Sequence, residues 1–319
     1  MKLGIQLDLR NPAPWRRSVG AVYGEALDLC VAAEQAGLDS IWLSEHHLFE
    51  DGYLPQPLTF AAAVAARTRR VRIGTAVLLA PLRTPVQIAE EVAVVDALSN
   101  GRVDLGLGAG YLLEEFTLYG RDPATRRAAT DRTVRELRRI WAGGTVTPAP
   151  VQPRVPIWLG YTGPLGARRA GRLGEGLLAV DPVRLPDYRA GLAEGGHDPA
   201  SARTAGVVSA YVTEDPDRDW PRLRPHHAYM YASYRDAAAR GTANTARGFG
   251  QDPDRVDDIG GALGTVVVDT PEAVAAAVRA HVGDGPVDTV YVWAAPGGLP
   301  RDMAEQHVAA LGRLATLLR

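Results

Sequence analysis

Short apolar runs alternate with amphipathic stretches along most of the chain. The runs are bounded by turn residues and are rich in branched aliphatic side chains, a pattern typical of buried parallel strands. The stretches between them repeat apolar residues every three or four positions, which predicts helices. The predicted strands are residues 3–9, 40–46, 71–79, 103–108, 157–160, 177–180, 206–212 and 289–293.

About eight strands separated by helices favour an α/β fold of the (β/α)8 TIM barrel type over an open doubly wound sheet. A chain of 319 residues is a usual length for one such barrel, so we expect a single barrel domain over 1–319. The alternation of strands and helices is interrupted at about 215–261. Asp-Pro pairs, aromatic residues and glycines there predict an insertion before the last strand–helix units. A helix over 223–239 is expected inside it.

The composition of the chain limits the binding partners and the types of chemistry that we expect. The net charge of −2 argues against a nucleic-acid or anionic-membrane surface, and the sequence has neither a signal-peptide pattern nor an apolar run of membrane-spanning length. We therefore expect a cytoplasmic protein. Lys2 is the only lysine, which excludes Schiff-base chemistry at a strand end and a Walker phosphate loop. The single cysteine, Cys30, excludes an intrachain disulfide.

The second predicted strand ends in Glu45, His46 and His47. In parallel α/β proteins reactive groups gather beyond the carboxyl ends of strands. Because successive side chains alternate, one histidine is expected to point into the cavity above the strand and the other to brace it. Adjacent strand positions diverge and no further His or Cys cluster follows, so we expect no metal site.

Several ordered motifs carry a family resemblance. They are WLSEHH (42–47), IGTAVLLAP (73–81), PVQIAEEV (85–92), DALSNGR (96–102), GLGAGY (106–111) and PIWLG (156–160). Together they resemble the bacterial luciferase-like flavin-dependent monooxygenase family. The resemblance implies a (β/α)8 barrel that binds a reduced flavin or deazaflavin at its carboxyl face. It also implies a homodimer whose interface includes the helix after the third strand.

The resemblance also assigns roles to residues. His46 matches the family's active-site histidine, which would donate or accept a proton. The bond between Ala76 and Val77 matches a non-proline cis peptide that presses on the flavin ring. An ordinary strand end is the alternative for this pair, and a capping histidine is the alternative for His46.

The glycines of 106–110 do not form a dinucleotide-binding loop, because Tyr111 replaces the third glycine and no helix begins there at once. Gly108, Ala109 and Gly110 are instead expected to let flavin or backbone approach closely. Flavin monooxygenases of the family place an arginine where this chain has Ala109. The small residue resembles the deazaflavin-using branch, so the cofactor is expected to be reduced FMN or the deazaflavin coenzyme F-420.

Two further sites are expected outside the barrel strands. Thr162 and Gly163 open a helix after the fifth strand, where backbone amides attract a phosphate such as that of a flavin; Thr162 could equally serve only as the helix cap. In the insertion, His227 and Tyr231 recur at helical spacing. They are predicted to line a substrate pocket, with core packing as the alternative.

The function that follows is a two-component monooxygenase that takes reduced FMN from a separate flavin reductase and oxygenates a small organic molecule with oxygen. The alternative within the fold is hydride transfer with a deazaflavin. Two further alternatives belong to other functional classes. One is a flavin-binding partner subunit without chemistry, and the other is a hydrolase that uses paired carboxylates such as Asp8 and Glu45.

Overall fold

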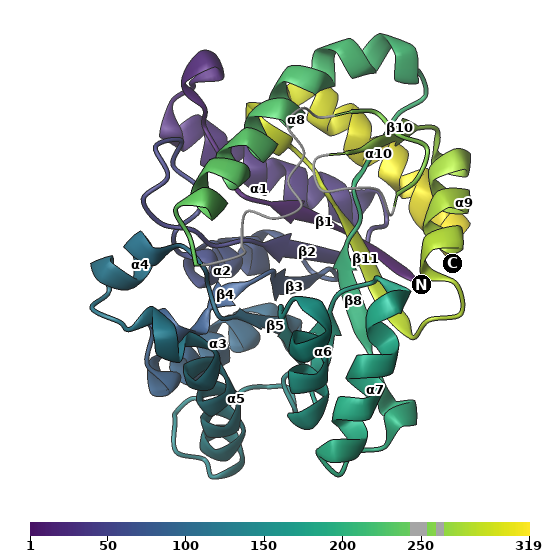
Figure 1. The fold of residues 1–319 in the computed structure, drawn as a ribbon. Helices are drawn as coiled ribbons and strands as arrows, with labels where there is room; N and C mark the ends of the chain where they lie inside the picture. Colours follow the sequence, from purple (N-terminus) through teal and green to yellow (C-terminus); the bar gives the residue numbers. More distant parts are fainter. Residues whose placement is uncertain (243–253, 260–264) are drawn as a thin grey trace.

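The computed structural model describes residues 1–242, 254–259 and 265–319, and its strands close into a parallel barrel surrounded by helices (Figure 1). Neighbours around the barrel follow the order β1, β2, β3, β5, β6, β7, β8, β11 and back to β1. This confirms the (β/α)8 prediction. The barrel strands are β1 (Lys2–Leu7), β2 (Ser40–Leu43), β3 (Arg72–Thr75) with β4 (Leu78–Leu79), β5 (Val103–Gly108), β6 (Ile157–Leu159), β7 (Gly176–Leu178), β8 (Thr204–Val207) and β11 (Val287–Trp293).

Helices between the strands form the outer layer, and two more lie in the loops at the carboxyl ends of the strands (Figure 1). The short α4 (Leu113–Leu118) follows β5, and the long α8 (Pro216–Ala239) precedes the last strand–helix units. The outer helices are α1 (Val19–Gln35), α2 (Pro57–Arg67), α3 (Pro85–Ser99), α5 (Arg126–Ala142), α6 (Gly163–Arg172), α7 (Leu185–Glu194), α9 (Pro271–Val282) and α10 (Arg301–Leu318).

Several elements differ from the sequence prediction. The strand expected over 71–79 is interrupted by a cis peptide and becomes β3 and β4. The strand expected over 206–212 splits into β8 and β9 (Ala210–Val212), and β9 pairs with β10 (Val267–Asp269) outside the barrel. The strand expected over 40–46 ends at 43, which leaves His46 in a loop.

The helix of the insertion begins earlier than expected. The side chain of Asp215 accepts the backbone N–H of Arg218, and Pro216 occupies the first turn, so capping moves the start of α8 seven residues upstream of 223. Residues 243–253 and 260–264 of the predicted insertion lie outside the described residues.

Aromatic side chains fill the barrel interior. The rings of Trp42 and Tyr291 stack with centroids 4.8 Å apart, and Trp158 meets Trp42 edge-on. Gly74 makes room for this layer, because a Cβ there would lie 2.4 Å from the Trp42 ring. The filled interior closes the barrel below the carboxyl ends of the strands, where the loops carry the polar groups described below.

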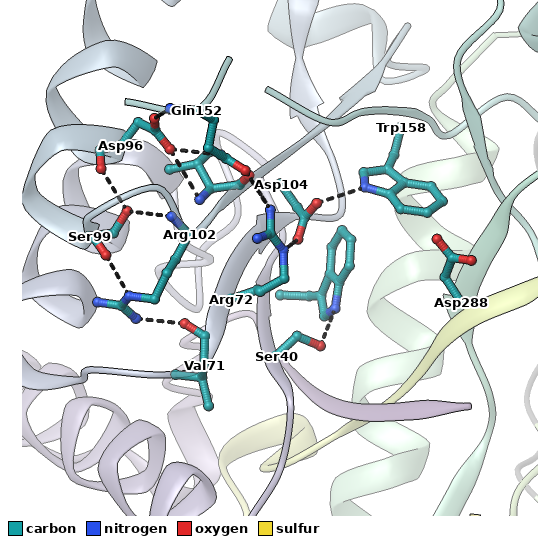
Figure 2. Close-up of polar contacts among 12 residues, drawn as sticks. Ser40, Val71, Arg72, Asp96, Ser99, Arg102, Asp104, Gln152, Trp158 and Asp288 are labelled. Carbon is teal, nitrogen blue, oxygen red and sulfur yellow. Dashed lines mark hydrogen bonds and ion pairs between the residues drawn. The ribbon is translucent and has the colours of Figure 1, made fainter. Parts of the chain in front are cut away.

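A polar network ties the amino ends of the strands together (Figure 2). Arg72 at the start of β3 pairs with Asp104 of β5, and Asp104 accepts the indole N–H of Trp158 at 3.2 Å. The proline-rich connector before β6 joins through Gln152, whose amide donates to Asp96 at 2.7 Å. These contacts fix the register of β3, β5 and β6 at the amino ends of the strands. His46 lies at the opposite end of the barrel.

Arg102 connects two helix ends to the start of β3. Its guanidinium donates to the carbonyl oxygens of Ala65 and Thr68 at the end of α2, to that of Ser99 in α3 and to that of Val71. It also donates to the Thr68 hydroxyl. Burial lowers the pKa of Arg102 from its ordinary value, but these acceptors compensate the buried charge.

We expect R102K to lower the free energy of unfolding by about 2–4 kcal/mol, because an ammonium group cannot reach all five acceptors and leaves buried carbonyls unpaired. Chemical denaturation measures the difference. R132K, at an exposed position of α5, is the matched control and should change stability by less than about 0.5 kcal/mol. Equal effects of the two substitutions would contradict this role.

Candidate active site at the carboxyl ends of the strands

His46 is buried, with 7% of its surface exposed, and lies next to a fully buried carboxylate. Its Nδ1 is 2.8 Å from Oε1 of Glu115, and the same oxygen accepts the backbone N–H of His47 at 2.8 Å. The other oxygen, Oε2, has no partner among the described residues. Glu115 therefore holds both the loop after β2 and the imidazole of His46.

Local geometry brings Glu115 to this position. Gly110 adopts a φ of +70° just after β5, a conformation that favours glycine, and turns the chain into α4. Phe116 packs against Gly110 from the next turn, since a Cβ on the glycine would lie 3.2 Å from its ring. Glu115, in the first turn of α4, thereby faces the end of β2 across 69 residues of sequence.

The other nitrogen of His46 faces a tyrosine. The Tyr111 hydroxyl is 3.3 Å from Nε2 of His46. Burial raises the pKa of Tyr111 well above its ordinary value, so the phenol is neutral and carries its proton. Glu115, His46 and Tyr111 form a hydrogen-bonded line that runs from a buried carboxylate to a half-buried phenol.

Aromatic rings enclose His46 on its other sides. The ring centroids of Phe49 and Tyr53 each lie 5.0 Å from the imidazole, and that of Tyr234, on α8, lies 6.1 Å away. The hydroxyls of Tyr53 and Tyr234 are 2.7 Å apart. The surroundings of His46 are therefore largely apolar, with phenol groups as their polar atoms.

A buried ion cluster supports these rings. Arg10, just beyond β1, donates to Asp8 at 3.0 Å and to Asp51 at 2.6 Å, and its guanidinium lies 4.5 Å from the Tyr53 ring centre and 4.8 Å from that of Tyr234. Burial is the main cause that raises the pKa of Asp8, to about 6, against the opposing attraction of Arg10. The cluster joins the end of β1 to the loop after β2 and to α8.

Glu45 and His47 have the bracing role expected for the other face. Glu45 accepts bonds from His47 Nε2, from Arg83 and from the backbone N–H of Leu79 at the end of β4. Asp8, its partner in the hydrolase hypothesis, is bound to Arg10. Each carboxylate is already held by an arginine, so this arrangement gives no support to paired-carboxylate hydrolysis.

The bond between Ala76 and Val77 is cis. The carbonyl oxygen of Ala76 accepts the side-chain amide of Gln6 at 3.3 Å, and the same amide donates to the Ser44 hydroxyl at 2.6 Å. Gln6 Oε1 is buried and has no partner among the described residues. Ala76 and Val77 remain half-buried, so this small backbone step forms part of the mouth of the barrel.

Gly106 and Gly108 lie in the second half of β5, directly before the loop that holds Ala109 and Gly110. A Cβ on Gly108 would lie 2.3 Å from Val77 Cγ2, so this glycine makes room for the Val77 side chain. A Cβ on Gly106 would lie 1.8 Å from the Thr75 carbonyl oxygen. Ala109 and Gly110, by contrast, stay half-buried at the mouth. They are the members of this loop that a ligand could approach.

The remaining predicted residues lie on two helices. Thr162 is the N-cap residue of α6, yet its side chain accepts no helix N–H, and Gly163 has a φ of +72°. Thr162 is an exposed residue, and its hydroxyl is not used for capping. On α8, the rings of His227 and Tyr231 meet with centroids 4.6 Å apart. They share a helix face with Tyr234, which lies seven residues after His227.

A cavity of about 540 Å³ adjoins His46 between the loop after β2 and the start of α1. Its wall combines apolar and aromatic side chains, such as Val22 and Phe49, with polar and charged ones, among them Asn11, Arg16, Arg17, Glu50 and Asp51. Within the described residues no group of three or more His, Cys, Asp or Glu side chains is arranged to hold a metal ion. The helices of that part of the chain are also too short or too polar to cross a membrane.

Sequence reasoning missed Glu115, Arg10 and the rings around His46. One signal for Glu115 was present: an acidic residue placed among apolar neighbours directly after the glycine-rich turn. Tyr111 was noted only as the residue in the place of a glycine. Arg10 follows Asp8 by two residues, but nothing in the sequence shows that the pair is buried together with Asp51, which lies 41 residues away.

Comparison with known proteins gives the family. A family model for luciferase-like monooxygenases matches residues 1–288. An F420-dependent glucose-6-phosphate dehydrogenase of Kineococcus radiotolerans is 30% identical, with 93% of this chain and 92% of that protein covered. An alignment with a dehydrogenase of the same description covers 55% of its length.

Monooxygenases match as well. The oxygenase component of a flavin-dependent trigonelline monooxygenase of Acinetobacter baylyi is 31% identical, with 52% of this chain and 50% of that protein covered. The structure of the monooxygenase RslO1 from Streptomyces bottropensis superimposes with a TM-score of 0.73 and 26% identity, and 98% of both chains is covered. The chain belongs to the luciferase-like monooxygenase family and is an oxidoreductase enzyme of that family.

Proposed function

We propose that the protein transfers a hydride between a deazaflavin coenzyme of the F420 type and a small alcohol or carbonyl compound. The observation that carries the proposal is the buried His46–Glu115 pair at the mouth of the barrel. Oxidation of an alcohol to a carbonyl compound releases one hydride and one proton, and the reverse reaction takes up both. The cofactor, when bound, accepts or donates the hydride, and the protein must supply the site for the proton.

His46 is suited to that task. Glu115 Oε1 accepts the His47 backbone N–H, so it acts as an acceptor toward Nδ1 of His46 as well, and Nδ1 carries the hydrogen. Nε2 is then the basic nitrogen and accepts the Tyr111 hydroxyl. In oxidation, the substrate hydroxyl proton passes to Tyr111 as the Tyr111 proton passes to Nε2, and in reduction it returns the same way.

The residues at the mouth fit a cofactor with a flat ring and a phosphate. Ala76, Val77, Ala109 and Gly110 are half-buried residues that follow β3 and β5 at the carboxyl ends of the strands. The orphaned Gln6 Oε1 offers an acceptor near Ala76, whose carbonyl oxygen accepts a hydrogen bond from the nitrogen of the same amide. Thr162 and Gly163, with the backbone amides that open α6, would hold the phosphate. His227 and Tyr231 would line the substrate side from α8.

Two observations favour the deazaflavin. The dehydrogenase relative that aligns over 92% of its length is named as F420-dependent, and Ala109 stands where an arginine is expected in the flavin-using branch. Retention of a buried, fully oriented imidazole also argues against a partner subunit without chemistry. A homodimer is part of the proposal by family analogy alone.

A two-component FMN monooxygenase is the second candidate. It is favoured by the likeness to RslO1 over 98% of the chain and by the trigonelline oxygenase component. In that case a separate reductase would supply reduced FMN, and oxygen would be a co-substrate. The rings around His46 would then serve mainly to exclude water from the reacting centre.

An anaerobic titration separates the two candidates. We expect reduced F420 to bind at least tenfold more tightly than reduced FMN, and the bound deazaflavin to persist when oxygenated buffer is added. Tighter binding of reduced FMN, followed by oxidation in the presence of oxygen, would support the monooxygenase. Absence of binding by either cofactor would overturn both candidates.

We expect E115Q to slow the single-turnover rate of hydride transfer by about 100-fold, because glutamine no longer fixes the protonated nitrogen of His46. Cofactor affinity should stay within twofold, which separates this effect from a loss of structure. E114Q is the matched control, since Glu114 is the exposed neighbour on the same helix and pairs with Arg240. Similar rates for the two variants would refute a role for Glu115.

Removal of the Tyr111 hydroxyl tests whether this group passes the proton between the substrate and His46. We expect Y111F to reduce the same rate about tenfold and to change the solvent isotope effect, because the proton then needs another path to His46. Y119F is the control, since Tyr119 contacts His47 on the bracing side. A solvent isotope effect that is identical in the wild type and Y111F would contradict the relay.

A further inference from the structure

We propose that Arg10 and Asp51 are specificity-determining residues of this site. Together they bind a second polar group of the substrate, one that both accepts and donates a hydrogen bond, such as a hydroxyl or a carboxamide. The inference rests on the proposed function, because it concerns the substrate of the same site. It goes beyond that function by assigning recognition of the non-reacting end of the substrate to a pair of residues outside the line of Glu115, His46 and Tyr111.

Two buried polar atoms of this ion pair are unsatisfied. Nη2 of Arg10 and Oδ1 of Asp51 have no hydrogen-bond partner among the described residues, and the two side chains are 0% and 2% exposed. Their contact joins Nη1 to Oδ2 at 2.6 Å and lacks the second parallel bond that guanidinium–carboxylate pairs often form. One donor and one acceptor therefore stay available, and buried groups of this kind require a ligand or bound water.

The other polar atoms of the two side chains fix the position of the pair. Nε of Arg10 donates to Asp8 at 3.0 Å, and Nη1 also donates to the Ser233 hydroxyl on α8 at 2.8 Å. Oδ2 of Asp51 accepts the Tyr229 hydroxyl, also on α8, at 3.2 Å. The unsatisfied donor and acceptor are thus held in place before a ligand arrives, so that binding orders few protein groups.

The pair lies close to the reacting centre. Asp51 contributes to the wall of the 540 Å³ cavity that adjoins His46. The ring centroids of Phe49 and Tyr53 each lie 5.0 Å from the imidazole, and the guanidinium carbon of Arg10 lies 5.0 Å and 4.5 Å from the same two centroids. By way of Tyr53, the guanidinium carbon is at most about 9.5 Å from the centre of the imidazole. A substrate with one six-membered ring between its two polar groups is therefore of suitable length.

Arg10 also borders open space on a second side. It contributes to the wall of a smaller cavity, of about 60 Å³, that lies between α1 and α10. The two cavities have Leu9, Arg17 and Val22 in common. Because one member of the ion pair borders each cavity, a small polar group has room beside the pair.

The two unsatisfied atoms select a neutral group. A carboxylate accepts from Nη2 of Arg10 but is repelled by Oδ1 of Asp51 and by Asp8, which also contacts Arg10. An ammonium group donates to Oδ1 but faces the guanidinium. A hydroxyl or a carboxamide satisfies both atoms at once. An analogue without such a group leaves both atoms unpaired, and sites of this kind discriminate strongly against it.

Three matched probes test the proposal: cyclohexanol, trans-4-hydroxycyclohexanecarboxamide and trans-4-hydroxycyclohexanecarboxylate. They share the ring and the reacting hydroxyl and differ at the opposite end. Calorimetry on the cofactor-loaded protein measures binding independently of turnover. We expect the carboxamide to bind at least tenfold more tightly than either of the others. The proposal is overturned if the carboxamide binds no more tightly than cyclohexanol, if the carboxylate binds as tightly as the carboxamide, or if none of the three binds.

D51N distinguishes recognition of the ligand from support of the fold. Asparagine keeps the shape of the side chain but replaces the acceptor Oδ1 by an N–H donor. We therefore expect the carboxamide to lose its advantage over cyclohexanol and the carboxylate to bind several-fold more tightly than it binds to the wild type. A purely structural role for Asp51 would instead weaken all three probes together. The comparison on the wild-type protein decides the proposal even where D51N does not fold.

E50Q is the matched control for the loss of charge. Glu50 is the exposed neighbour of Asp51 in the same cavity wall, and its substitution should keep the wild-type order of the three affinities. An E50Q protein that changes this order in the same way as D51N would show a general effect of charge and would overturn the role of Asp51.

The same titrations on the cofactor-free protein keep this test separate from that of the proposed function. If neither cofactor binds, the proposed function fails, while the order of the three affinities still decides the roles of Arg10 and Asp51. If a cofactor binds and the carboxamide has no advantage, the assignment of these two residues fails and the proposed function is unaffected.

Discussion

The contact between Glu115 and His46 is the constraint on which the rest of the site depends. A carboxylate with no exposed surface is costly to bury, and it is retained here because one oxygen accepts both a backbone N–H and an imidazole N–H. The contact ties the loop after β2 to the helix after β5. It also leaves the opposite nitrogen of His46 basic and directed at Tyr111. The Glu115–His46 contact therefore determines both the orientation of the imidazole and the position of the loop after β2.

The polar network that stabilises the fold and the candidate active site lie at opposite ends of the barrel. At the amino ends of the strands, Arg72, Asp104 and Arg102 bond to backbone and side chains until their polar groups are largely satisfied. At the carboxyl ends, several buried polar atoms lack partners within the described part of the chain, among them Gln6 Oε1 and Glu115 Oε2. Unsatisfied groups at one end of a parallel barrel are what a ligand-binding face is expected to retain.

Much of the fold could be predicted from the sequence because it depends on local patterns. Apolar runs and capping residues mark the barrel elements, and the ordered motifs indicated the cis bond between Ala76 and Val77. Strand lengths were overestimated where an apolar run continues through that bond. Gly108 was expected to let flavin or backbone approach closely, and the sequence does not show that the side chain of Val77 is the group it makes room for. Glu115 was missed because His46 lies 69 residues away, and the burial of the Arg10–Asp8 pair was missed because it depends on Asp51, 41 residues from Arg10.

The tautomer of His46 is the most direct test of this arrangement. Histidine labelled with 15N, observed in a multiple-bond proton–nitrogen correlation spectrum and assigned with the H46N variant, reports which ring nitrogen carries the hydrogen. The geometry predicts a neutral imidazole with hydrogen on Nδ1, and loss of that preference in E115Q. Hydrogen on Nε2 in the wild-type protein, or a spectrum that E115Q leaves unchanged, would contradict the role assigned to Glu115.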